Sequence, residues 1–217
     1  MALYKIAILI SGRGSNMAAL IDACRNPQYP AEVALVLSNR PDAAGLTTAR
    51  EADIPTKVIE HGDYENREAF DAAMTDILAA SGVRLICLAG FMRLLSAEFC
   101  RRWWDKIINI HPSLLPAFKG LCVHERMLEA GVRIAGCTVH FVRPAVDEGP
   151  ILVQAAVPIA ADDTPESLSA RILQQEHRIY PLAVRLIAEG RARTAGGTVA
   201  IDNYYLPRDI LVNPPPR

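Results

Sequence analysis

Cysteine is scarce in this sequence, and its distribution excludes one common use of that residue. Five cysteines, an odd number, are spread over the 217 residues, and no two of them have C-x-x-C spacing. A disulfide framework is not expected from such a pattern. The chain therefore fits a reducing cytoplasm.

Long apolar runs and an excess of charge of one sign are also lacking. The formal net charge is -1, so no overall field attracts nucleic acid or an anionic membrane. The apolar run at residues 6–10 is too short for a signal peptide, and no run approaches transmembrane length. There is no repeat, low-complexity block or interdomain linker. We predict one domain over residues 1–217, with a frayed tail at 207–217, that is monomeric or homodimeric and binds neither nucleic acid nor membrane.

Strand-like and helical patterns alternate through the first half of the chain. The strand-like runs are residues 5–10, 33–37, 57–59, 85–89 and 106–110, and the helical patterns are 17–24, 43–52, 66–80 and 96–103. This alternation predicts an α/β fold with a mostly parallel, doubly wound sheet. Farther along, the expected elements are a helix at 123–130, an antiparallel pair at 134–142 and 151–157, a long helix at 166–189 and a last strand region at 198–206. Pro181 is expected to kink or divide the long helix.

The turn after the first predicted strand lacks the third glycine of a dinucleotide-binding fingerprint. Residues 12–16 read Gly-Arg-Gly-Ser-Asn, and Met17 stands where that glycine would be. Glycines let a backbone approach a ligand, and a helix N-terminus attracts anions, so a phosphate site is expected here. Asn39 and Arg40 end the second strand in place of an acid, which leaves only an NADP-type alternative through Arg40. A tight turn without a ligand is the other alternative.

The stretch at residues 109–116, Asn-Ile-His-Pro-Ser-Leu-Leu-Pro, places an amide and an imidazole at a strand end. Asn109 and His111 are two residues apart, so both face one side of an extended chain. Such groups suit the stabilisation of an oxyanion and the handling of a proton. Asp147, in the next long loop, is placed to hold a water or orient an imidazolium. An ordinary strand end with a solvated histidine, and a turn aspartate, are the alternatives.

Other polar residues have less specific patterns. Glu176 lies in a helical charge cluster, which is usually a solvated face, but it is also able to reach a sugar hydroxyl if that helix lines a site. His140 sits in an alternating strand and is expected to be structural. No metal is expected, because no familiar ligand spacing occurs among Cys122, His124, His140 and Asp147.

Six stretches together resemble the glycinamide ribonucleotide formyltransferases of purine synthesis. They are residues 10–16, 88–95, 108–116, 136–142, 147–152 and 175–181, in the order of that family. The resemblance implies a Rossmann-like formyltransferase fold. It also implies transfer of the formyl group of 10-formyltetrahydrofolate to the amine of glycinamide ribonucleotide, through a tetrahedral intermediate and without a metal.

The resemblance further implies a role for individual residues. The catalytic set would be Asn109, His111 and Asp147. The substrate phosphate would lie on Gly14, Ser15 and Asn16, and its ribose on Glu176. Folate would be bound by Arg67, Met92, Arg93, Leu94, Leu95, Asn109, Arg143, Pro144, Ala145, Val146 and Asp147.

Two residues depart from the pattern of the family, and three other functions compete. Cys122 stands where the family often has histidine, and Glu148 stands where it often has glycine. If position 148 needs a positive φ, a glutamate there is strained. Formyltetrahydrofolate hydrolases and methionyl-tRNA formyltransferases share the catalytic stretch, although the near-zero net charge argues against a tRNA substrate. An NADP-binding reductase or nucleotide-binding module would use only the first turn.

Overall fold

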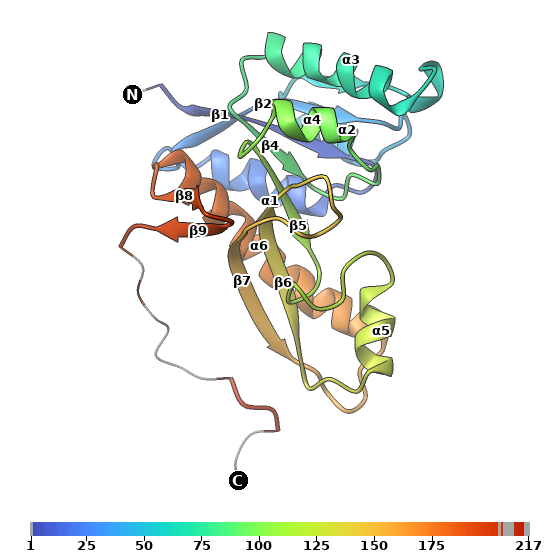
Figure 1. Cartoon of the computed structure of the whole chain (residues 1–217), viewed down its shortest axis with the longest axis vertical. Helices are drawn as coiled ribbons and strands as arrows, with labels where there is room; N and C mark the ends of the chain where they lie inside the picture. The colour runs from blue at the N-terminus through green and yellow to red at the C-terminus, as the bar shows by residue number, and fades with distance from the viewer. Residues whose placement is uncertain (1, 204, 206–210, 215–217) are drawn as a thin grey trace. The chain divides into compact units, whose positions relative to one another are not determined.

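The first strand, β1 (Tyr4–Ile10), contains five consecutive apolar residues with no exposed surface, as expected for a strand that is covered on both faces. A computed structural model describes residues 2–203, 205 and 211–214 (Figure 1). Its contacts divide the chain into two units, Met1–Asn109 with Phe141–Ala145, and Ile110–His140 with Val146–Arg217. The single domain that the sequence suggests stays a prediction.

The first unit is built on parallel strands in the order β3-β2-β1-β4-β5. Besides β1, these are β2 (Ala31–Ser38), β3 (Thr56–Val58), β4 (Leu85–Leu88) and β5 (Ile107–His111), whose last two residues belong to the second unit. Because the strands are parallel, their carboxyl ends lie along one edge of the sheet. That edge carries the turn after β1 and the loop after β4, which the sequence singles out as binding segments.

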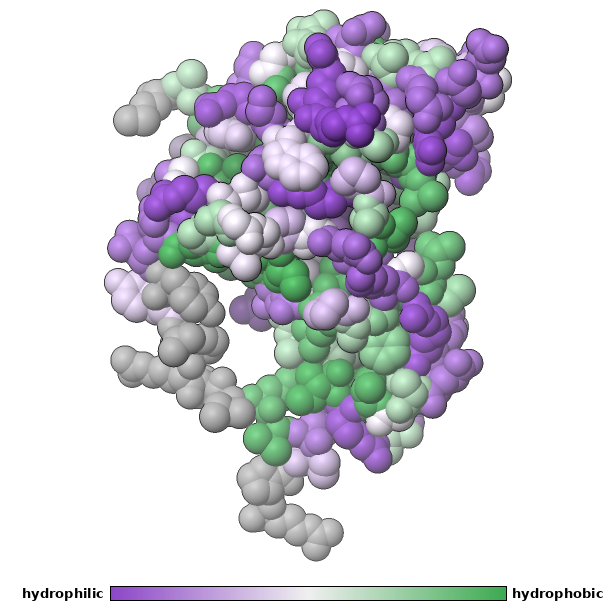
Figure 2. Space-filling model, in the orientation of Figure 1, coloured by the Kyte–Doolittle hydropathy of each residue, from purple (hydrophilic) through white to green (hydrophobic). Residues whose placement is uncertain are grey.

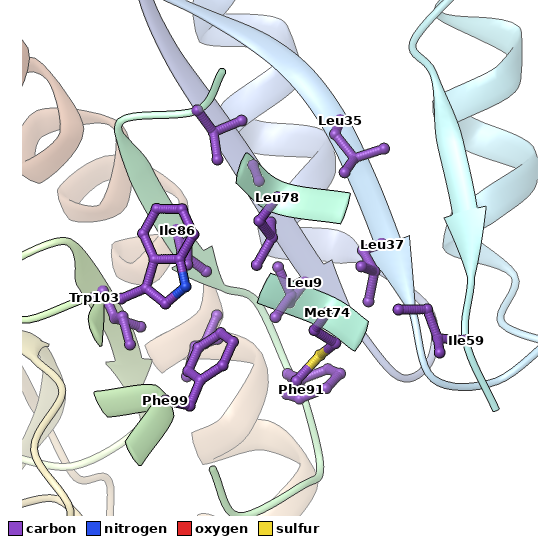
Figure 3. Close-up of a cluster of buried hydrophobic side chains, with 14 of the residues drawn as sticks. Leu9, Leu35, Leu37, Ile59, Met74, Leu78, Ile86, Phe91, Phe99 and Trp103 are labelled. Atoms are coloured by element: carbon purple, nitrogen blue, oxygen red, sulfur yellow. The ribbon is translucent and has the colours of Figure 1, made fainter. Parts of the chain in front are cut away.

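Two of the helices of the first unit begin at a capping side chain. They are α1 (Ser15–Cys24), α2 (Gly45–Glu51), the short 3-10 helix η1 (His61–Asp63), α3 (Arg67–Ala80) and α4 (Ala97–Arg102). The side chains of Asn66 and Ser96 accept hydrogen bonds from backbone N–H groups of α3 and α4, so both act as N-caps. Phe70, Met74 and Leu78 of α3 join the hydrophobic cluster of this unit, part of which Figure 3 shows.

The second unit contains α5 (Val123–Glu129), β6 (Ile134–Phe141), β7 (Ile151–Pro158) and the long helix α6 (Pro165–Ala188), and β6 ends in the first unit. β6 and β7 pair antiparallel, and α6 packs on β7 and α5. Thr164 and Ser167 form a reciprocal capping box at the start of α6. Pro181 lies inside the helix and does not divide it. The parallel strands and the later antiparallel pair confirm the predicted fold class.

The C-terminal region differs in detail from the prediction. β8 (Ala192–Ala195), which the sequence analysis does not anticipate, pairs with β9 (Thr198–Ile201) as a small hairpin. The strand expected over residues 198–206 is β9 over residues 198–201, followed by a turn at 202–203, and residues 204, 206–210 and 215–217 lie outside the described residues. Within the tail, the Asn213 amide donates to the carbonyl oxygens of Arg133 and Ile159, at 2.6 and 2.9 Å.

The surface over α4 follows the amphipathic pattern of the helix. Phe99 and Cys100 are buried, whereas Glu98, Arg101 and Arg102 are exposed, and Figure 2 shows a group of hydrophilic residues at the place of α4. Among the helices in the described part of the chain, none combines the length and apolarity that crossing a membrane requires.

Candidate active site

Asp147 lies between two imidazole rings in the second unit. Its Oδ2 atom is 3.4 Å from Nδ1 of His111, and its Oδ1 atom is 3.6 Å from Nε2 of His140. The three side chains are buried, with exposed fractions of 9%, 7% and 2% respectively. The Gly120 N–H also donates to Oδ2, at 2.9 Å. The Gly120 bond is short enough to orient the carboxylate, and the two imidazole rings lie against its two oxygens.

This environment keeps Asp147 ionised. Burial by itself raises the pKa of a carboxyl group, because it disfavours the charged form. Here the side chain of His140, the Gly120 N–H and the charges of the two imidazoles outweigh burial, and the pKa of Asp147 lies below its ordinary value. The site therefore holds a buried negative charge at neutral pH.

His111 faces an acceptor with each of its ring nitrogens. Its Nε2 atom is 2.9 Å from the carbonyl oxygen of Phe118, and Nδ1 faces Asp147. A carbonyl and a carboxylate only accept hydrogen bonds. The imidazole of His111 is thus held between two acceptors, the Phe118 carbonyl and the Asp147 carboxylate.

The loops around Asp147 contain several residues in the left-handed backbone region. Phe118, Gly120, Cys122 and Asp147 have φ values of 53°, 80°, 54° and 54°. Glu148 is not among the described residues with positive φ, so the strain considered for that position falls on Asp147 instead, a residue type that tolerates it better. Such backbone outliers occur preferentially at functional sites.

Cys122 and Glu148, the two departures from the family pattern, both lie on the surface. Cys122 precedes α5 and its side chain makes no capping hydrogen bond. Glu148 pairs with Lys119 at 2.8 Å, which links the turn of Asp147 to the loop before α5. A cavity of about 590 Å³ adjoins Asp147. Its lining is Leu115, Pro116, Lys119, Asp147, Glu148, Gly149, Pro150, Ile151, Gly197, Thr198 and Val199.

The predicted phosphate turn lies in the first unit, between β1 and α1. Gly14 precedes α1 with φ 74°, and a Cβ atom there would lie 3.0 Å from Cε of Met17 and 3.1 Å from Cα of Gly45. The position therefore requires glycine. Because Gly14 has no side chain to cap the helix, the N-terminus of α1 keeps a geometry suited to an anion. Asn16 is buried, and Ser15 is half-buried.

The residues predicted to bind folate divide into two kinds. Met92 and Leu94 are apolar, and their exposed fractions are 68% and 63%. The neighbouring Arg93 and the loop residues 144–146 are also exposed. Arg67, at the start of α3, is also exposed, whereas Leu95 is half-buried. Neighbouring exposed apolar side chains mark interaction or ligand sites when they form a patch, so the folate contacts of these residues stay a prediction.

Arg143 has other partners. Its guanidinium lies 3.9 Å from the ring centre of Trp104, and it also donates to Asp105 and to the Val142 carbonyl oxygen. Asn109 is half-buried in β5, beside Leu88 of β4. The guanidinium of Arg143 is thus held by protein groups, so its contact with folate stays a prediction.

The structure shows the surroundings of two residues for which the sequence left alternatives open, and it adds two backbone groups that the sequence did not single out. Glu176 is only 6% exposed, so it does not lie on a solvated face of α6. His140, expected to be structural, lies against Asp147. The roles of the Phe118 carbonyl and the Gly120 N–H had no signal in the sequence, because backbone groups carry no side-chain signature. In the described part of the chain, no three His, Cys, Asp or Glu side chains are grouped as metal ligands.

Residues 4–184 match the formyl transferase family. The chain belongs to the formyl transferase family. Phosphoribosylglycinamide formyltransferase of Escherichia coli is 41% identical to this formyl transferase, over 93% of this chain and 95% of that protein. The corresponding enzyme of Haemophilus influenzae is 44% identical over 96% of this chain and 99% of its own length.

Larger relatives and solved structures agree with this family. The trifunctional purine biosynthetic protein adenosine-3 of Bos taurus is 51% identical over 87% of this chain, which spans only 19% of that protein. The crystal structure of glycinamide ribonucleotide transformylase 1 from Symbiobacterium toebii has a TM-score of 0.90 and 51% identity, covering 92% of this chain and 94% of that one. A formyltetrahydrofolate deformylase from Pseudomonas syringae, at 22% identity and a TM-score of 0.86, shares the fold.

Proposed function

We propose that this formyl transferase moves the formyl group of 10-formyltetrahydrofolate to the amine of glycinamide ribonucleotide, a step of purine biosynthesis. The observation that carries the proposal is the buried Asp147 carboxylate against His111, whose two ring nitrogens both face acceptors. The near full-length similarity to proteins named phosphoribosylglycinamide formyltransferase supports the same substrate pair. A cytoplasmic monomer or homodimer stays a prediction.

The reaction begins when the neutral amine of the ribonucleotide attacks the formyl carbon. A carbon–nitrogen bond forms, the carbonyl oxygen becomes an oxyanion, and the bond to N10 of the folate then breaks. The Asn109 amide and the His111 imidazolium donate hydrogen bonds to that oxyanion, and loss of one such donor typically costs about 3–4 kcal/mol. The Phe118 carbonyl already accepts from Nε2 of His111, so it competes with the oxyanion for that hydrogen.

Asp147 has two tasks in this scheme. Its carboxylate faces Nδ1 of His111 at 3.4 Å and orients that ring. Its carboxylate also orders a water that carries the proton from the attacking amine to the leaving N10. Neither task requires a covalent enzyme intermediate or a metal-bound oxygen.

The binding segments would hold the two substrates as follows. The N-terminus of α1, with Gly14, Ser15 and Asn16, would take the ribonucleotide phosphate, and the buried Glu176 carboxylate would accept hydrogen bonds from ribose hydroxyls. The exposed apolar side chains of Met92 and Leu94 would cover the folate rings. Arg143 would act through the backbone of its loop, because its guanidinium is engaged by Trp104 and Asp105.

The test is an assay of the purified chain with both substrates. We expect tetrahydrofolate to appear only when glycinamide ribonucleotide is present. Turnover without the ribonucleotide would instead identify a hydrolase. A formyltetrahydrofolate deformylase shares the fold. Absence of turnover, with binding of a nicotinamide cofactor, would favour the reductase.

A matched pair of histidine variants tests the assignment of the centre. His111→Ala should lower kcat by roughly 10²–10³-fold, as expected when an oxyanion donor is removed. His61→Ala changes an exposed histidine of η1 and should leave kcat within about threefold, because surface substitutions have small effects. A His111→Ala variant with near-normal kcat would remove His111 from the catalytic set.

A further inference from the structure

Ser11, the residue directly after β1, joins three segments of the first unit. Its N–H donates to the Gly90 carbonyl oxygen at 3.1 Å. Its hydroxyl accepts from the Met92 N–H at 2.8 Å and donates to Oδ1 of Asn39 at 2.6 Å. Ser11 and Asn39 are 7% and 5% exposed. One buried hydroxyl is therefore both donor and acceptor among the ends of β1, β2 and β4.

These contacts lie between two segments of the proposed site. Ser11 immediately precedes the phosphate turn at residues 12–16, and Met92 begins the folate segment at residues 92–95. The side chains at positions 92, 93 and 94 are exposed, whereas Leu95 packs partly buried against the hydrophobic cluster, so burial holds only the end of that segment. At its start, the Met92 N–H donates a hydrogen bond to the Ser11 hydroxyl.

A second buried side chain holds the other end of the same segment. Oδ2 of Asp71 accepts a hydrogen bond from the Ser96 N–H at 2.6 Å, and Asp71 is 3% exposed. The folate segment thus runs between two buried side-chain anchors, Ser11 at its start and Asp71 just after its end. Neither anchor belongs to the segment, and neither side chain is exposed enough to present itself to a ligand.

We propose that Ser11 is a positioning residue that sets the folate segment against the phosphate turn, with Asn39 orienting its hydroxyl. The inference rests on the proposed function, because that function assigns folate to residues 92–95. Removal of the hydroxyl leaves the Met92 N–H and the Asn39 amide oxygen without this buried partner. The segment then moves among several positions, and folate binding must order it again.

Steady-state kinetics separates this role from general stabilisation. Ser11→Ala should raise KM for 10-formyltetrahydrofolate about tenfold, the equivalent of one lost buried hydrogen bond. KM for glycinamide ribonucleotide should stay within about twofold, because the backbone bond from Ser11 to Gly90 remains. The kcat value should change by less than about threefold, because Ser11 does not touch the reacting atoms. Asn39→Leu, which removes the acceptor of the hydroxyl, should act in the same direction.

Ser38→Ala is the matched control. Ser38 is also buried, at the end of β2, but its hydroxyl bonds to the backbone of Arg40. Its loss should lower the melting temperature without changing KM for folate. A Ser11→Ala variant with unchanged KM for folate, an equal rise in both KM values, or a Ser38→Ala variant with the same KM rise would each overturn the proposal.

Hydrogen exchange tests the same idea without turnover. In the protein without substrates, the Met92 amide should exchange at least about tenfold faster in Ser11→Ala than in the wild type, and amides of α6 should not. Unchanged exchange at Met92 would overturn the positioning role even if the wild type is active. A wild type that transfers no formyl group, but shows the faster exchange in the variant, would instead refute the proposed function and leave the anchor intact.

Discussion

Asp147→Asn is the most informative single change, because it removes a charge while it preserves the shape of the side chain. The carboxylate lies 3.4 Å from Nδ1 of His111 and 3.6 Å from Nε2 of His140, and all three side chains are nearly buried. Two unit charges about 4 Å apart interact by about 4 kcal/mol at an effective dielectric constant near 20. The amide group that replaces the carboxylate retains a dipole but no net charge, so we expect most of this interaction with His111 to be lost.

The expected kinetic result is a fall in kcat of roughly 10²–10³-fold, since about 1.36 kcal/mol corresponds to tenfold in rate. Glu148→Gln removes the same charge one residue later, but Glu148 is 54% exposed and pairs with Lys119 in solvent. An exposed ion pair contributes about 0–1 kcal/mol, so this control should keep kcat within about threefold. Initial rates with both substrates measure the two variants. The role of the Asp147 charge is refuted if Asp147→Asn stays within about tenfold of the wild type, or if Glu148→Gln loses as much.

Asp147→Asn should also change how the stability of the folded chain depends on pH. The pKa of Asp147 in the folded chain lies below its ordinary value, because the His140 side chain, the Gly120 N–H and the imidazole charges outweigh burial. The resulting stabilisation is complete above the unfolded pKa of about 3.9 and is lost as pH falls through the lower folded value. Acidification from about pH 5 to pH 3 should therefore lower the melting temperature of the wild type more than that of Asp147→Asn. Calorimetry that shows the opposite trend would contradict this account.

Three further changes test other parts of the chain. Asp163→Asn breaks two hydrogen bonds from Arg171, at 2.6 and 2.8 Å, that hold the pKa of Asp163 far below its usual range. Because Arg171 is partly exposed, we expect the free energy of unfolding to fall by about 2 kcal/mol, which lowers the melting temperature by about 4–8 °C at pH 7. The difference should shrink below pH 4, and an equal fall at pH 7 and below pH 4 would argue against the ion pair. Gly136→Ala places a Cβ atom 2.0 Å from a carbonyl oxygen of β7 and should strongly reduce the melting temperature or the soluble yield. Gly62→Ala is the control, because a Cβ atom there meets open space. Similar stability of the two variants would show that the strands separate easily. Glu176→Gln should raise KM for glycinamide ribonucleotide about tenfold with a smaller change in kcat, as measured from initial rates. An unchanged KM would remove Glu176 from the ribose site.

Features set by near neighbours in the chain were predictable. The apolar run of β1 and the caps Asn66, Ser96 and Thr164 all involve residues within a few positions of one another. Hydrophobic periodicity and helix capping act over that range, so the order of helices and strands in the first half follows from the sequence. The hairpin strand β8 was missed, since its four residues alternate too briefly to give a period.

The candidate site was predictable only in its side chains. Asn109 and His111 share one strand, so their common direction follows from the two-residue period of extended chain. The backbone partners of the centre are the Phe118 carbonyl and the Gly120 N–H. Their positions depend on loop residues with left-handed backbone conformation, which no residue pattern predicted. The sequence left open whether Glu176 lies on a solvated face or lines a site, because its neighbours along α6 are charged, and the structure shows it buried.

By itself, the sequence determined the α/β alternation, the family resemblance and the residue types available at each strand end. Only the tertiary structure decided which of them meet. Ser11 and Met92 are 81 residues apart, and Gly120 and Asp147 are 27 residues apart, yet each pair forms a hydrogen bond. The physical reason is that local periodicity specifies a strand or a helix. A buried polar contact, in contrast, exists only after packing has brought distant segments together and has excluded the water that would otherwise satisfy them.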